Sequence, residues 1–183
     1  MSQTPQLSNG DASESGELTD KTLSDLDFVA MSCLPPHFVE DVSETALQNL
    51  VRCHHDLMRA SDIGSKLPTN DVNYQALLNQ VTAFILASCD DLDEHTRLQA
   101  LCKLRHIYFK MDATDREIWL SSLWLALDAS NFPRKMQEKF WYWMESFSIQ
   151  LLSTQPFQVK LMRYPFNWFL IRTKHPALSM CRR

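Results

Sequence analysis

Glycine is nearly absent from the chain, and this constrains the fold more than any other feature of the sequence. The 183 residues contain three glycines, Gly10, Gly16 and Gly64. Glycine supplies the positive-φ positions that tight hairpins and phosphate-binding loops require. A β-rich fold and a glycine-rich nucleotide site are therefore disfavoured, and helices are expected throughout.

Composition and charge predict an ordinary soluble protein. The chain is 45% hydrophobic and 22% charged, which is usual for a globular domain. Its net charge of -4 gives no reason to expect nucleic acid as a partner. No apolar run approaches the roughly 20 residues that a membrane-spanning helix needs. Five cysteines without paired spacing, and no recognisable signal peptide, predict reduced thiols in the cytoplasm.

The two ends differ in composition from the middle of the chain. Residues 1–25 are polar and acidic and contain few large apolar side chains, which predicts a disordered tail. Residues 26–155 are expected to form one helical domain. Residues 156–183 form a basic, aromatic extension, for which we expect packing back over the core, because Phe166, Trp168 and Phe169 are costly to expose. Alternatively, the extension could lie on an anionic membrane surface or bind a partner protein.

Apolar residues recur at helical spacing in five segments of the domain. The predicted helices are about 43–60, a helix that begins near 68–71 and continues to Ile85, a helix that begins near 90–94 and continues to Phe109, a helix from 112 or 114 to Ala126, and a helix that follows a turn at 131–133 and continues to Leu151. The fourth is expected to bury positions 118/119, 122/123 and 125/126. The fourth begins at Asp112 or Thr114, and Thr114 with Glu117 fits a capping box. Asp128 and Glu145 are expected on polar faces. Five helices with short connections predict a bundle or a globin-like stack.

The segment from residue 104 to residue 128 decides between these two. It contains an Arg-His pair followed by an apolar residue and a phenylalanine, then a charged triplet, a Trp-Leu pair and an Ala-Leu-Asp triplet. The residues are Arg105, His106, Ile107, Phe109, Asp115, Arg116, Glu117, Trp119, Leu120, Ala126, Leu127 and Asp128. This pattern resembles the proximal segment of the group II truncated haemoglobins, and the aromatic run 140–147 resembles their last helix. The resemblance covers about residues 40–153 and is strongest over 104–152. It implies an all-α globin-like stack of the truncated, two-over-two type.

The resemblance also implies a haem b group and residues that hold it. His106 corresponds to the proximal iron ligand, and Arg105 is placed to reach a haem propionate. Phe109 would line the pocket, and Trp119 would donate its indole N–H to bound dioxygen. Without the resemblance, a single histidine and these aromatics would be read as ordinary core residues. Cys102 and His106 have a spacing that could also hold zinc, but no second ligand pair accompanies them.

The opposite, distal side of the implied pocket departs from the family. Where the family carries Phe-Tyr-Asp-Leu-Met, this chain has two histidines, in the run 54–58. His55 takes the place of the tyrosine, and could donate to bound oxygen or coordinate the iron. The alternative is that both histidines lie partly at the surface without a role. Other candidates for a polar distal group are Tyr74, Gln75 and Gln80.

The sequence supports two functions of different classes. The first is a haem protein that binds a diatomic ligand and serves in oxygen binding or transport. Such a protein could also be an enzyme, either a nitric oxide dioxygenase that works with a reductase or a protein with a peroxidase-like side activity. The second is a globin-fold sensor or protein-interaction module that has lost haem. No nucleic acid or transmembrane segment is expected in either.

Overall fold

The computed structural model describes residue 34, residues 37–89, residue 99, residues 103–104, residues 108–153 and residues 162–169. Within these residues the secondary structure is helical, without strands: α2 (Phe38–Asp41), α3 (Glu44–Arg59), the 3₁₀ helix η1 (Gly64–Lys66), α4 (Asp71–Ala87), α6 (Ala113–Ala129) and α7 (Arg134–Gln150). The four long helices agree with four of the predicted segments. The expectation of an all-α fold is confirmed. Of the predicted helix 90–109, the described residues 99, 103 and 104 are helical, whereas Tyr108 and Phe109 are not, so the predicted end at Phe109 was wrong.

Polar side chains fix where the long helices begin. Ser43 accepts from the backbone N–H of Ala46 at the start of α3, and Asn70 accepts from two backbone N–H groups at the start of α4. These contacts satisfy amide groups that lack partners in the first turn. Asn131, whose φ of 57° is tolerated by asparagine, makes the predicted turn before α7.

The cap of α6 differs from the predicted one. The structure forms a capping box between Asp112 and Asp115, each side chain accepting from the other's backbone N–H. The predicted box of Thr114 and Glu117 was therefore wrong by two residues. The shorter aspartate at the third helical position still reaches back to the first amide, so the motif works without a glutamate.

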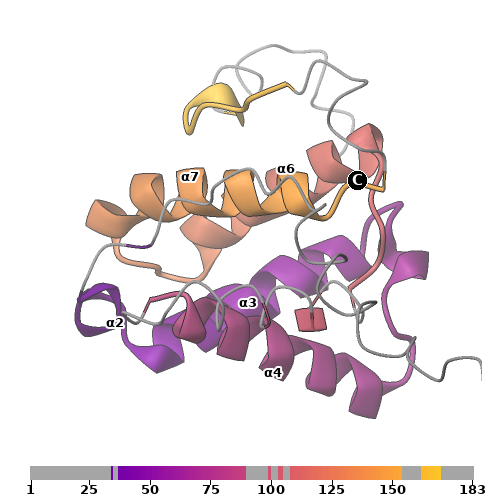
Figure 1. The fold of residues 1–183 in the computed structure, drawn as a ribbon, viewed down its shortest axis with the longest axis horizontal. Coiled ribbons are helices and arrows are strands. Elements are labelled where there is room, and N and C mark those ends of the chain that lie inside the picture. Colours follow the sequence, from indigo (N-terminus) through magenta and orange to yellow (C-terminus); the bar gives the residue numbers. More distant parts are fainter. Residues whose placement is uncertain are drawn as a thin grey trace, which may run out of the picture.

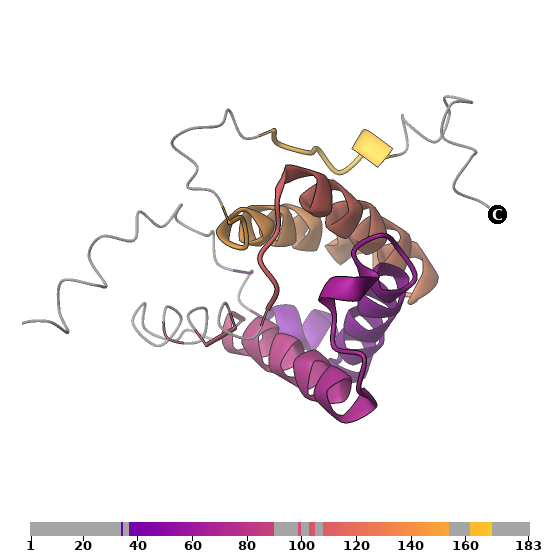
Figure 2. The same cartoon turned by 90° about the vertical axis from the view of Figure 1, so that its right-hand side faces the viewer.

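The helices form two layers. Figures 1 and 2 show α3 and α4 in one layer and α6 and α7 in the other. The most extensive packing between elements is that of α3 against α6, and α3 also packs against α4 and α6 against α7. This arrangement is the predicted two-over-two stack. It leaves α3 and α6 face to face at the centre of the molecule.

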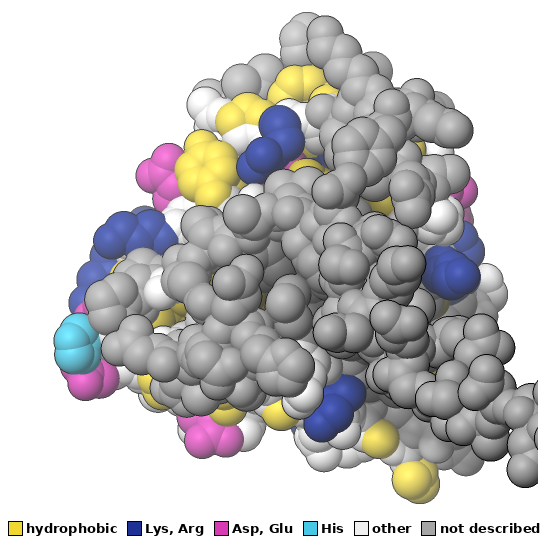
Figure 3. Space-filling view, viewed as in Figure 1, with side chains coloured by type: hydrophobic (Ala, Val, Ile, Leu, Met, Phe, Trp, Pro, Cys, Tyr) yellow, Lys and Arg dark blue, Asp and Glu magenta, His cyan; other side chains and the backbone are white. Residues whose placement is uncertain are grey.

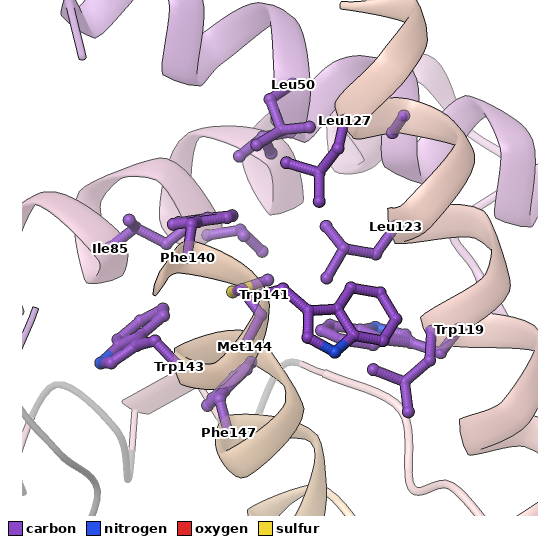
Figure 4. Packing of buried hydrophobic residues seen from close by; sticks show 14 of the residues in the cluster. Leu50, Ile85, Trp119, Leu123, Leu127, Phe140, Trp141, Trp143, Met144 and Phe147 are labelled. Atoms are coloured by element: carbon purple, nitrogen blue, oxygen red, sulfur yellow. The ribbon is translucent and has the colours of Figure 1, made fainter. Parts of the chain in front are cut away.

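The core between the layers is rich in aromatic side chains. Figure 4 shows residues from α3, α4, α6 and α7 meeting there, including Leu50, Ile85, Leu123, Phe140 and Phe147. Phe84 lies 5.0 Å from Phe147 between ring centroids. Burial of such side chains is worth about 1.5–3 kcal/mol each. The core therefore joins all four long helices.

Helix α6 is apolar on more than one side. Its predicted buried stripe included Leu125, which is 46% exposed, whereas Leu120 and Leu127 are buried. The stripe was misplaced because α6 is covered both by α3 and by the C-terminal segment, so hydrophobic spacing alone gives no single face. Trp124, for example, contacts Phe169 of that segment.

Residues 162–169 lie against α7 and α6, as predicted for the C-terminal extension. The indole N–H of Trp141 donates to the carbonyl oxygen of Tyr164 at 2.8 Å. Phe169 is buried and lies 5.7 Å from Trp141 between ring centroids. Figure 1 shows the segment beside these helices. The rest of the extension and the N-terminal tail lie outside the described residues, and the predicted domain boundaries stay predictions.

A buried ion pair holds this segment in place. Arg116 of α6 and Glu145 of α7 are 3% and 1% exposed, and their closest nitrogen and oxygen are 2.5 Å apart. Arg116 also donates to the carbonyl oxygen of Met162, and Arg163 donates to Glu145. The expectation that Glu145 lies on a polar face was therefore wrong. The C-terminal segment turns that face into an interior one, while Asp128 is exposed as expected.

The visible surface carries charges of both signs. On the face in Figure 3, basic and acidic side chains of the described residues are interspersed and do not gather into one patch. None of the helices in the described parts of the chain is both long enough and apolar enough to cross a membrane.

Candidate functional site

Two adjacent histidines of α3 begin the candidate site. His54 and His55 are each 1% exposed, so the alternative that they lie at the surface is excluded. They are buried because the inner stripe of α3 continues through positions 47, 50, 51 and 58, and α6 packs directly on it. Buried polar side chains need hydrogen-bond partners. Those partners identify the site.

His55 is held in one tautomer. Its Nδ1 lies 2.8 Å from the carbonyl oxygen of Val51, which can only accept, so Nδ1 carries the proton. The remaining ring nitrogen, Nε2, is therefore an acceptor. It lies 3.1 Å from the hydroxyl oxygen of Tyr108. Tyr108 donates to it and so joins α3 to the segment that precedes α6.

Trp119 of α6 completes the chain of hydrogen bonds. Its indole Nε1 donates to the hydroxyl oxygen of Tyr108 at 2.8 Å. His54 donates through Nε2 to the backbone carbonyl of Trp119 at 3.0 Å, and its ring meets the indole edge-on. The chain of donors runs from Trp119 through Tyr108 to His55, and from there to Val51. We refer to Trp119, Tyr108 and His55 as the buried polar triad.

The triad is electrically neutral at pH 7. Burial lowers the pKa of His55 from 6.5 to about 4, against the opposing effects of the hydrogen bond to Val51 and the charge of Asp56. Burial, followed by the neighbouring His55, lowers the pKa of His54 well below its ordinary value. Burial also raises the pKa of Tyr108. The site thus offers a neutral donor and a neutral acceptor in an apolar surrounding.

Aromatic rings and a small pocket border the triad. Trp119 lies 6.3 Å from Phe147 between ring centroids, and its place in the core is visible in Figure 4. On the other side, Tyr108 and the stacked Phe109 line a pocket of about 100 Å³ together with Lys110 and residues 151–153. Tyr108 therefore belongs both to the buried triad and to the pocket.

The structure places three of the five predicted site residues close together. His55 and Trp119 share Tyr108 as a hydrogen-bond partner, and Phe109 is half-buried beside that tyrosine. Arg105 and His106 lie outside the described residues, and their roles stay predictions. Cys102, the other half of the proposed zinc pair, also lies outside them.

The alternative distal residues on α4 point elsewhere. Gln75 and Gln80 are exposed, and Gln75 bonds to Arg52. Tyr74 is buried, but its hydroxyl donates to Asp56 at 2.7 Å. Neither the hydrogen bond of Gln75 nor that of Tyr74 goes to the triad, so His55 is the best-placed of the sequence candidates.

Tyr108 is the site residue that sequence reasoning missed. It lies in the segment that carries the resemblance, two positions after His106 and directly before Phe109. The family pattern leaves this position open, so nothing in the sequence marked Tyr108 as a site residue. Its importance depends on the positions of His55 and Trp119, which lie 53 residues before it and 11 residues after it.

The architecture and the packing of α3, α4, α6 and α7 define a globin-fold protein. A crystal structure of phosphate-bound Hell's gate globin IV is similar to the chain, with a TM-score of 0.65 and 25% sequence identity over 89% of this chain and 99% of that one. No protein-family model and no curated protein sequence matches the chain.

The globin fold implies haem, and the described residues fit such a group in kind. Neutral imidazole, indole N–H and a wall of aromatic rings are the groups with which proteins line haem pockets. Here they converge in the buried triad beside Phe147. In the described residues no group of three or more His, Cys, Asp or Glu side chains is placed to hold a metal ion by itself.

Proposed function

We propose that this chain is a haem-binding protein related to the group II truncated haemoglobins, in which His106 is the proximal ligand of the iron. The observation that supports it best is the buried triad of Trp119, Tyr108 and His55 in a globin fold. Apolar side chains of similar shape would pack this core about as well, because the hydrogen bonds of buried polar groups largely offset the cost of their desolvation. The donor and acceptor groups of the triad suit a site that forms hydrogen bonds with a small polar ligand.

When bound, haem supplies an iron that coordinates a diatomic ligand, here oxygen or nitric oxide, on the face opposite the histidine. Arg105 would bind a propionate, and Phe109 would line the pocket. Trp119 would donate its N–H to the ligand, because a donor there stabilises the negative charge that bound oxygen acquires. His55, neutral at pH 7, would accept from a protonated ligand atom. The aromatic wall excludes water.

The setting proposed for this activity is the cytoplasm, with a reductase as partner if the protein turns over. Cys53, one of the described cysteines, carries a free thiol, which suits a reducing compartment. Nitric oxide dioxygenation would need the reductase to restore ferrous iron after each cycle. Simple ligand binding or transport would need none.

One observation favours a second function, that of a haem-free interaction or sensor module. In the chain alone, the Tyr108 hydroxyl already satisfies both Trp119 and His55, so the core is complete without a ligand. The C-terminal segment, held by Arg116 and Glu145, would then be the part that contacts partners.

Titration with hemin distinguishes the two. The wild type should develop a Soret band at one equivalent, His106→Ala should lose or strongly weaken it, and His37→Ala should not, because His37 is 73% exposed and paired with Glu40. A wild type without a Soret band, under conditions in which a control globin loads, rejects haem binding. A Soret band unaffected by His106→Ala rejects His106 as the ligand.

A further inference from the structure

The C-terminal segment, residues 162–169, lies on α6 and α7 in the manner of a bound peptide. Its first four residues belong to no helix or strand, and side chains of the two helices contact their backbone. Arg116 donates to the carbonyl oxygen of Met162 at 2.7 Å, and Trp141 donates to the carbonyl oxygen of Tyr164 at 2.8 Å. Such contacts depend on an extended backbone rather than on the covalent link to α7.

Glu145 gives this surface a preference for a basic residue. One of its carboxylate oxygens accepts from Arg116 and lies 3.4 Å from the backbone nitrogen of Tyr164. The other accepts from Arg163, whose nitrogens lie 2.8 and 2.7 Å away. Glu145 is 1% exposed and Arg163 is 58% exposed, so the acid belongs to the surface and the base to the segment that covers it. An acidic residue at the position of the arginine would face a buried carboxylate.

Aromatic side chains anchor the segment. Tyr164 and Phe169 are buried, and Phe166 and Phe169 lie 6.1 and 5.7 Å from Trp141 between ring centroids. Pro165 restricts the residue before it, Tyr164, to an extended conformation, which the backbone contacts require. Binding of extended, proline-containing peptides to aromatic surfaces is a general mode of protein recognition.

We propose that Arg116, Trp141 and Glu145 form a docking surface for an extended peptide of a partner protein. The peptide carries a basic residue, an aromatic residue, proline and a second aromatic residue, in this order. The C-terminal segment occupies the surface until such a peptide displaces it, and its first residue, Met162, is 55% exposed, so a competitor reaches that end first. This inference does not depend on haem. It refines the second proposed function, because the partner binds the surface that the segment covers.

The covalent link of the segment to α7 sets how a partner competes. A segment joined to its own site by a short stretch of chain competes at an effective concentration of roughly millimolar, so a free peptide of the same sequence binds the wild type weakly. Its apparent affinity is reduced by the fraction of molecules in which the surface is open. A substitution that weakens only the chain's own segment therefore tightens the binding of a free peptide. A segment with a purely structural role gives no such effect.

The experiment uses the full-length protein and a fluorescein-labelled peptide with the sequence of residues 162–169. Arg163→Glu in the protein places a negative charge beside Glu145 and keeps the aromatic anchors, so the peptide should bind this variant about tenfold or more tightly than the wild type. Arg52→Glu is the matched control, because Arg52 is exposed on α3, in the other layer. Fluorescence anisotropy measures the affinities. Equal binding to the three proteins, or no binding to Arg163→Glu at millimolar peptide, overturns the proposal.

A second variant and a structural measurement guard against a folding defect in the first. Pro165 is exposed, so Pro165→Ala removes the restriction on Tyr164 without loss of buried atoms, and it should tighten peptide binding by about twofold to fivefold. By NMR, hydrogen exchange of the Trp141 indole N–H should be faster in Arg163→Glu than in the wild type, and slow again when the peptide is added. A peptide that binds without slowing this exchange overturns the proposal. Equal binding by a peptide that carries Tyr164→Ala and Phe169→Ala does the same.

A second copy of the chain is the other occupant with this chemistry. Because each segment covers its own surface, analytical ultracentrifugation of the wild type should give the mass of the monomer at all concentrations. A dimer that Arg163→Glu abolishes would overturn the choice of a separate partner and assign the surface to a second copy.

Discussion

Acid should destabilise this protein through its buried histidines, and the size of the effect follows from His55. The pKa of His55 is lowered to about 4 in the folded chain, against 6.5 in the unfolded chain. Above pH 6.5 both states are neutral at this residue. Between pH 6.5 and pH 4 only the unfolded state takes up the proton, so the free energy of unfolding falls as the pH falls.

The magnitude is about 1.4 kcal/mol for each pH unit of that interval. His55 alone therefore removes about 3 kcal/mol between pH 6.5 and pH 4. His54, whose pKa is also lowered, acts in the same direction and steepens the loss. A total stability of about 5–15 kcal/mol is usual, so this loss is large enough to shift the unfolding midpoint strongly.

Urea unfolding of the haem-free chain, followed by circular dichroism at pH values from 7.5 to 4.5, measures the effect. His55→Gln removes the titrating group, and its free energy of unfolding should depend less steeply on pH below 6.5 than that of the wild type, whatever its absolute stability. His37→Gln is the control, since His37 is exposed. Equal slopes for wild type and His55→Gln would refute the burial argument.

Two further substitutions test the packing around the site. Glu145→Gln removes the charge that pairs with the buried Arg116. It should lower the free energy of unfolding in urea by about 3–5 kcal/mol, because an uncompensated buried charge remains. Glu138→Gln, at an exposed position of the same helix, is the control and should change this free energy very little. Gly64→Ala should cost about 1–3 kcal/mol in thermal unfolding by overpacking, because its Cβ would lie 2.2 Å from the backbone oxygen of Arg59. A Gly64→Ala protein as stable as the wild type would contradict that geometry.

The sequence by itself determined the class of fold and the approximate positions of the long helices. Three local features carried this information: the near-absence of glycine, the helical spacing of apolar residues, and polar caps such as Asn70. Each involves residues close together in the chain, so each can be recognised before the fold is known. The resemblance around Trp119 pointed to the globin-like stack, which the packing of the helices confirms. His55 was identified in the same way, from a departure at one position.

Tertiary structure decided which side chains meet. Tyr108 became a site residue only because α3 and α6 bring His55 and Trp119 to its hydroxyl group, and contacts across 53 residues have no local signature. Glu145 was misread for the same reason. Its burial depends on Arg116 and on the C-terminal segment that covers it, whereas periodicity describes one helix at a time. Local patterns thus specify elements, and burial of polar groups depends on what packs over them.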